Sequence, residues 1–128
     1  MLLVAAAGVL FLLGLLHSVL GEWLVFRRMH QVSGFSPVGF PPLLRPDTPI
    51  GTLRACWHLL TIMGWTSAVI LARFGAAAEL GSGERFVARA ISISLAACAA
   101  AVFVGTRARH IGWIGFSLAA ALGWLGAG

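Results

Sequence analysis

The chain has 128 residues, of which 59% are apolar and 10% are charged, whereas soluble domains average about 45–50% apolar and about 25% charged residues. Together with a mean hydropathy of +0.94, this composition excludes a water-soluble globular protein and a disordered tail. The formal net charge of +5 includes nine arginines and no lysine. Because no nucleic-acid-binding motif accompanies them, these arginines indicate membrane topology, and no nucleic-acid partner is expected.

Four apolar runs are each long enough to cross about 30 Å of hydrocarbon as a helix. In chain order the predicted spans are residues 2–21, 53–73, 88–106 and 110–127. Residues 22–52 form an interfacial loop, in which Pro37, Pro41 and Pro42 prevent a continuous helix. The sequence therefore predicts an all-α integral membrane protein. It is one membrane domain, residues 1–128, folded as a four-transmembrane-helix bundle with a long Pro-rich loop between helices 1 and 2.

The arginines are distributed unequally between the two sides of the predicted bundle. The side that carries the long loop and the loop between helices 3 and 4 holds six of them, against three on the other side: Arg27, Arg28, Arg45, Arg54, Arg107 and Arg109, against Arg73, Arg85 and Arg89. The positive-inside rule then places the long loop in the cytoplasm and both termini in the periplasm. With no targeting extension in the sequence, a bacterial inner membrane is the expected location.

Small residues spaced four apart form two rows along the third predicted span: Ser92, Ala96 and Ala100, and Ala97, Ala101 and Gly105. Such rows let helix backbones approach closely in lipid. They favour contacts with copies of the same chain or with other membrane subunits, although they are equally compatible with closing the four-helix core itself. If they form an oligomer, substituting Ala97 or Gly115 by leucine is expected to disrupt it. Cys56 and Cys98 lie in apolar runs and are expected to be buried thiols.

All four histidines fall toward the predicted cytoplasmic face: His17 near the end of helix 1, His30 in the loop, His58 in helix 2 and His110 at the start of helix 4. Because an ionisable group within a span usually faces a bundle interior or a cavity, these histidines mark the candidate site. Arg54 and His58 are four residues apart and share a helix face with Thr61. Glu22 reaches the same region if Gly21 breaks the first helix. Ser18 and Glu22 are four residues apart, a spacing that lets the Ser18 hydroxyl support the carboxylate.

The histidine cluster has four interpretations. A divalent transition metal is ligated by His17, His58 and His110 with Glu22 or His30, because imidazole and carboxylate are its common ligands. Alternatively, haem b takes His17 and His58 as axial ligands and Arg54 or Arg27 pairs with a propionate. In a structural interpretation, Glu22 pairs with Arg27 or Arg54 and the histidines hydrogen-bond to loop carbonyls. A proton relay or substrate path is the fourth.

Spans occupy nearly all of the chain, which leaves little soluble mass for an independent active site. The sequence therefore predicts a small polytopic protein of the lipid bilayer that acts mainly through helix–helix interaction, as a homo-oligomer or as an accessory or assembly subunit of a larger membrane complex. A haem- or metal-binding redox protein is the alternative, and a channel or carrier is third. Enzymatic activity is not expected. Hydrolysis is disfavoured because the neighbouring His17 and Ser18 point about 100° apart on a helix and G-x-S-x-G is absent.

Overall fold

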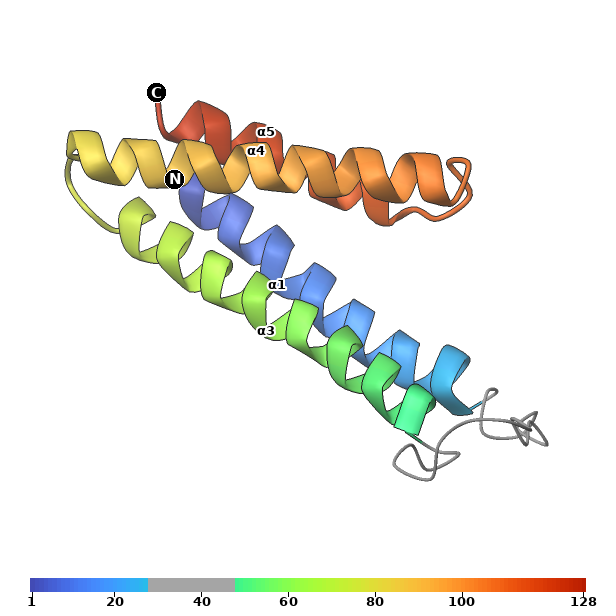
Figure 1. Cartoon of the computed structure of the whole chain (residues 1–128). Helices are drawn as coiled ribbons and strands as arrows, with labels where there is room; N and C mark the ends of the chain where they lie inside the picture. Colours follow the sequence, from blue (N-terminus) through green and yellow to red (C-terminus); the bar gives the residue numbers. More distant parts are fainter. Residues whose placement is uncertain (28–47) are drawn as a thin grey trace. The chain divides into compact units, whose positions relative to one another are not determined.

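A computed structural model describes residues 1–27 and 48–128, and the regular structure within these ranges is entirely helical (Figure 1). In chain order the elements are α1 (Leu2–Leu20), the π-helix η1 (Gly21–Phe26), α3 (Thr48–Gly75), α4 (Ser82–Gly105) and α5 (Gly112–Gly126). The predicted all-α class is therefore confirmed for the described residues. Pro37, Pro41 and Pro42 of the predicted loop lie outside them, as does His30.

Of the helical stretches in residues 1–27 and 48–128, three are long and apolar enough to cross a membrane: Leu2–Phe26, Gly51–Gly75 and Ser82–Gly105. They correspond to the first three predicted spans, although the first continues five residues past its expected end. The fourth predicted span, residues 110–127, corresponds to α5. This helix is shorter than expected, because residues 106–111 form the turn that precedes it. With 15 residues, α5 is about 22 Å long, against about 30 Å of hydrocarbon.

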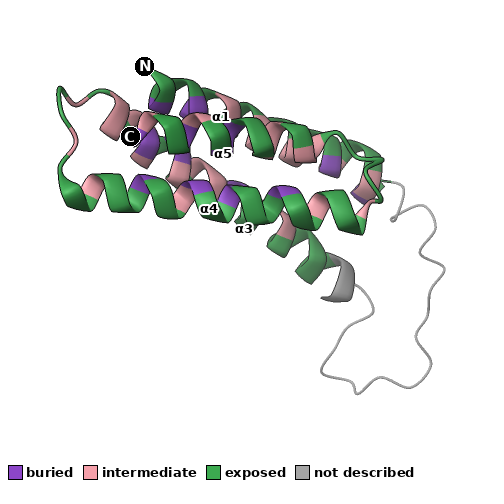
Figure 2. Ribbon diagram, turned by 90° about the horizontal axis from the view of Figure 1, so that it is seen from above, coloured by how far each residue is buried: buried purple, intermediate pink, exposed green. Residues whose placement is uncertain are grey.

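The described residues belong to two compact units. Unit 1 comprises Met1–Leu13 and Gly64–Gly128, and unit 2 comprises Gly14–Met63. In unit 1, α4 lies along α5 (Figure 1). Segments of four helices contribute small and aliphatic side chains to one core: Leu3, Ala6, Ala7, Leu10, Ala68, Leu71, Ala88, Leu95, Ala119, Ala120 and Ala127. Figure 2 shows these buried positions as short patches, while most of the remaining helix surface is exposed. Lipid is the natural solvent for that surface.

Helix α4 has one buried face and one exposed face. Its buried residues are spaced four, three and four apart: Ala88, Ser92, Leu95 and Ala99. Of the two predicted rows of small residues, only Ser92 is buried, whereas Ala97, Ala101 and Gly105 are exposed. Cys98 and Cys56 are exposed as well, so the prediction of buried thiols is wrong. The expectation for Gly115 stays a prediction, but a Cβ there would meet the Leu13 side chain within unit 1, so a leucine at this position would also disturb the packing of unit 1 itself.

The turn between α4 and α5 contains two non-glycine residues in the left-handed region of backbone conformation. Arg107 has a φ of 50° and Ala108 a φ of 61°. The turn is held by a hydrogen bond from the Ala108 N–H to the Phe103 carbonyl, 2.8 Å, and by one from the Thr106 hydroxyl to the Val102 carbonyl, 2.7 Å. In this region a Cβ costs roughly 1–2 kcal/mol per residue.

Replacing Ala108 with glycine is expected to stabilise the protein by about 0.5–1 kcal/mol. Glycine relieves the Cβ clash, and its greater freedom in the unfolded chain offsets only part of that gain. Thermal unfolding in mild detergent measures the effect as a higher Tm. The control is Ala121→Gly, at an exposed position within α5, which is expected to lower Tm because glycine weakens a helix interior. An equal fall in both variants would contradict the strain argument.

Candidate functional site

Polar side chains gather in unit 2 where the end of α1 and the start of η1 lie against α3. We call five of them the polar cluster: Ser18, Glu22, Arg54, His58 and Thr61. On α3 the three members are spaced four and three residues apart, so successive turns present them on one face. Four of the sequence-predicted site residues, His17, Glu22, Arg54 and His58, therefore belong to this region of unit 2.

The Ser18 hydroxyl connects the two helices. Its Oγ lies 3.0 Å from Nδ1 of His58 and 3.1 Å from Oγ1 of Thr61. Thr61 is buried, with 4% of its surface exposed. The expected support of the Glu22 carboxylate by Ser18 is therefore replaced by a link to α3. The four-residue spacing of Ser18 and Glu22 gave no sign of this, because it describes neighbours on one helix only.

The Glu22 carboxylate faces two residues of α3. Nη2 of Arg54 donates to Oε1 at 2.6 Å, and Nε2 of His58 lies 3.7 Å from Oε2. Oε2 is buried and has no hydrogen-bond partner among the described residues. The Arg54 pairing agrees with one of the two partners expected in the structural interpretation. Since the side chains of Arg54 and Glu22 remain 49% and 36% exposed, we expect this ion pair to add little stability.

The first helix does not break at Gly21, contrary to the expectation, but changes to π-helical geometry over Gly21–Phe26. The Arg27 N–H bonds to the carbonyl of Glu22, five residues earlier. Because of this wider turn, side chains after Gly21 point in other directions than they would in an uninterrupted α-helix. The Glu22 side chain points toward α3. π-Helical turns are rare and often occur at functional sites.

Trp57 fixes the position of this turn. Its indole Nε1 donates to the His17 carbonyl at 2.9 Å, and its ring stacks on the His17 imidazole with centroids 4.1 Å apart and planes 6° apart. The Phe26 ring packs edge-on against it at 5.7 Å. The indole also rests on Gly21, where a Cβ would come within 2.8 Å of its Cζ2 atom and closer to Nε1 and Cε2. Helical spacing and composition alone did not indicate this central position for Trp57.

The predicted ligand sets are assembled only in part. Glu22 and His58 lie together, whereas the His17 ring stacks on Trp57. His110 belongs to unit 1, where its Nδ1 accepts a hydrogen bond from the Gly112 N–H at 3.0 Å. Within residues 1–27 and 48–128, no three side chains of His, Cys, Asp or Glu are close enough together to hold a metal ion. The structure thus supplies a polar cluster but no assembled metal site in these ranges.

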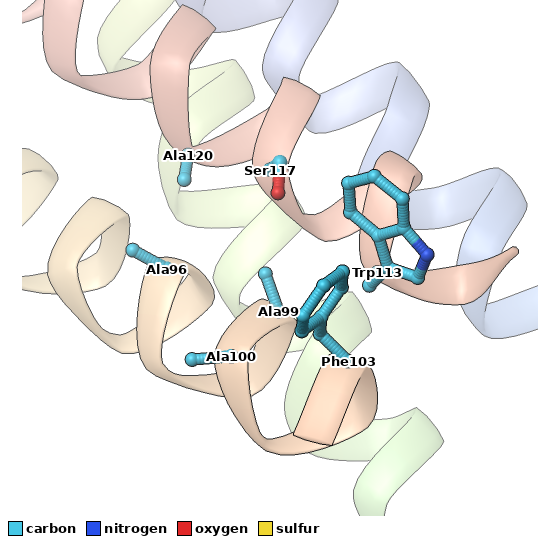
Figure 3. A pocket seen from close by; sticks show the side chains of 7 residues that line it. All are labelled: Ala96, Ala99, Ala100, Phe103, Trp113, Ser117 and Ala120. Atoms are coloured by element: carbon cyan, nitrogen blue, oxygen red, sulfur yellow. The ribbon is translucent and has the colours of Figure 1, made fainter. Parts of the chain in front are cut away.

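A second feature is an apolar groove of about 340 Å³ in unit 1, between α4 and α5 (Figure 3). Small side chains form most of its lining, and two aromatic rings stand at one end: Ala96, Ala99, Ala100, Phe103, Trp113, Ser117 and Ala120. The rings of Phe103 and Trp113 meet edge to face, with centroids 5.2 Å apart. The Ser117 hydroxyl points toward the space between the two helices (Figure 3).

The Ser117 hydroxyl differs from those of α4. Ser92 and Ser94 each donate to the carbonyl four residues earlier, at 2.8 and 3.0 Å, which is the usual arrangement for a serine within a helix. No hydrogen bond joins the Ser117 hydroxyl to another described residue. In lipid no water is present to hydrogen-bond with this hydroxyl, so a hydrogen bond to a partner outside the chain would stabilise it.

Comparisons with protein families, curated proteins and solved structures gave no match to this chain. The chemistry and geometry of the two features above are therefore what bears on function. The polar cluster lies in unit 2 and the groove in unit 1, and each is considered separately below.

Proposed function

We propose that this chain is a small polytopic membrane protein that acts mainly through helix–helix interaction, as a homo-oligomer or as an accessory subunit of a larger membrane complex. The observation that carries the proposal is the exposed face of α4. Ala97, Ala101 and Gly105 are exposed along this face, flanked by Ile93 and Val104, whose exposed fractions are 60% and 73%.

The small residues on the exposed surface of α4 favour contact with another helix over contact with lipid alone. Lipid tails are as apolar as leucine, so helices in a membrane associate through close packing and hydrogen bonds and not through the hydrophobic effect. A row of small residues between large ones creates a channel along which a second helix approaches closely. A surface that met only lipid would have no need of this shape. The exposed row on α4 therefore favours another transmembrane helix as its occupant.

The groove extends this surface. Ala96 and Ala100 line the groove and directly precede Ala97 and Ala101 in the chain, so the exposed row and the groove are neighbouring parts of α4. Ser117 adds a hydroxyl that can hydrogen-bond to an incoming helix, a contact worth roughly 0.6 kcal/mol on average in membranes. The combination of close-packing surface and polar contact is typical of helix–helix interfaces.

The proposal includes a topology. Four membrane-embedded helices, with the short α5 packed on α4, place six arginines on the side of the long loop and three on the other. The positive-inside rule then supports a cytoplasmic long loop and periplasmic termini in a bacterial inner membrane.

Oxidative crosslinking through the native Cys98 tests the proposal in membranes. Cys98 is exposed and lies three residues before Ala101 on α4, on the side of the small-residue row. In a Cys56→Ser background, we expect a Cys98-dependent crosslinked product. The double variant Ala97→Leu/Ala101→Leu is expected to reduce it at least about fivefold, because two bulky side chains prevent close approach.

The control is Val69→Leu, which also enlarges an exposed side chain, on α3, and is expected to leave the product unchanged. A product of twice the monomer mass identifies a homo-oligomer, and another mass identifies a different subunit. A product that is absent, or unaffected by the double variant, would contradict the proposal.

A further inference from the structure

We propose that Ser18 is a nucleophilic hydroxyl that accepts an acyl group from a membrane-soluble ester or thioester, with His58 as its base and Glu22 as a positioning residue. This inference concerns unit 2 and is independent of the proposed helix–helix interaction.

The geometry supplies the three parts of an activated nucleophile. Such a site places a hydroxyl within hydrogen-bond reach of a base, and the base is in turn oriented by a third group. Here Ser18 Oγ lies 3.0 Å from Nδ1 of His58, and the other ring nitrogen lies 3.7 Å from Oε2 of Glu22. The latter distance is longer than a hydrogen bond, but catalytic contacts are commonly loose before a substrate binds.

The Oε2 atom of Glu22 indicates which nitrogen of His58 carries the proton. Glu22 Oε1 already accepts from Arg54, whereas the buried Oε2 has no donor in the described part of the chain. A neutral His58 with its proton on Nε2 directs that proton at Oε2 and leaves Nδ1 as an acceptor. The Ser18 hydroxyl has one hydrogen, which can turn between Thr61 Oγ1 at 3.1 Å and His58 Nδ1 at 3.0 Å, and in this arrangement it donates to Nδ1. The result is a single chain of donors that ends at the carboxylate and polarises the Ser18 O–H bond.

The contacts of Ser18 differ from those of the serines on α4. Ser92 and Ser94 satisfy their hydroxyls on their own helix, whereas Ser18 directs its hydroxyl to a base on another helix. Ionisable groups within candidate spans are costly and are retained mainly where they serve a function. The site is also open, because 39% of the His58 side chain and 36% of the Glu22 side chain are exposed.

The step balances as an acyl transfer. The Ser18 Oγ–carbonyl carbon bond forms, and the bond from that carbon to the leaving oxygen or sulfur breaks. The Ser18 proton passes to His58 Nδ1 and then to the leaving alcohol or thiol. The product is an ester on Ser18, and no oxidant, reductant or metal enters the balance.

A fluorophosphonate probe tests the proposal, because it reacts with an activated serine and releases fluoride. We expect the full-length protein in mild detergent to be labelled at Ser18, as located by peptide mass spectrometry. Ser18→Ala is expected to abolish labelling, and His58→Gln to slow it about 100-fold, the lower range of general-base contributions. The matched control is Ser94→Ala, an exposed helix serine outside the cluster, which should be labelled at the wild-type rate.

Nitrogen-15 NMR of the wild-type protein gives a second readout that needs no variant. The His58 ring is expected as the neutral tautomer with its proton on Nε2. Failure of the wild-type protein to react, labelling elsewhere, undiminished labelling of helical His58→Gln protein, or a proton on Nδ1 alone would each overturn the proposal. The Ala97→Leu/Ala101→Leu variant is expected to be labelled normally, so failure of the helix–helix proposal remains distinguishable.

Discussion

Gly21→Ala is expected to push apart the two helices of unit 2 and to cause a large loss of stability. A Cβ at Gly21 would overlap the indole of Trp57, within 2.8 Å of Cζ2 and closer to two other ring atoms. The indole is a rigid neighbour, held by its bond to the His17 carbonyl and by its stacking on the His17 ring. Overpacking of this kind costs about 1–3 kcal/mol or more, and the displaced indole also loses its hydrogen bond.

Denaturant titration in mixed micelles measures this effect, and the near-ultraviolet circular dichroism of the tryptophans reports the displacement of Trp57. The matched control is Gly8→Ala on the same helix, where a Cβ would meet nothing within 4 Å. We expect that control to be unchanged or slightly stabilised, because alanine favours the helix. Equal stability of the two variants would show that Trp57 does not rest on Gly21.

The contrast between Gly21 and Gly8 shows which features of the first helix could be predicted from the sequence and which could not. Both glycines lie in one apolar run, and hydropathy predicted that run as a membrane helix. The close contact at Gly21 and the π-helix that follows depend on Trp57, which is 36 positions later in the chain. A residue's own neighbours in sequence carry no sign of such a contact, so the first helix was expected to end where it instead changes its hydrogen-bond pattern.

In the polar cluster, too, the sequence predicted one feature and not another. The spacing of Arg54, His58 and Thr61 predicted their common face on α3, because helical periodicity is a local property. Which residue of α1 meets each of them depends on the relative rotation of two helices. The expected Ser18–Glu22 contact is therefore replaced by the Ser18–His58 contact, while the pairing of Glu22 with Arg54 agrees with the structural interpretation.

The rows of small residues on α4 show a related limit of sequence reasoning. Both rows contain residues of similar size with the same spacing, so composition alone could not decide which positions pack within the chain. The structure buries Ser92 and leaves Ala96 and Ala100 of the same row exposed, as it does Ala97 and Ala101 of the other. A test of the buried side must therefore address Ser92 and the residue opposite it.

Gly123→Ala is expected to loosen the packing of α4 on α5 by about 1–3 kcal/mol. A Cβ at Gly123 would lie 2.5 Å from the Ser92 hydroxyl oxygen. That oxygen cannot move away easily, because Ser92 is 2% exposed and its hydroxyl is bonded to the Ala88 carbonyl at 2.8 Å. The measurement is the free energy of unfolding in mixed micelles.

Ser92→Ala in the Gly123→Ala background is expected to restore most of the lost stability. It removes the clashing oxygen, and the Ser92 Cβ is 3.7 Å from the added methyl group, an ordinary van der Waals distance. Ser92→Ala alone should cost little, because the Ala88 carbonyl keeps its helical partner and the lost hydroxyl leaves no unsatisfied group. The three variants form a double-mutant cycle, in which residues in contact couple by about 0.5–3 kcal/mol. Additive effects of the two substitutions would mean that these helices do not meet at Ser92 and Gly123, whereas a favourable coupling would show that the two residues are in contact.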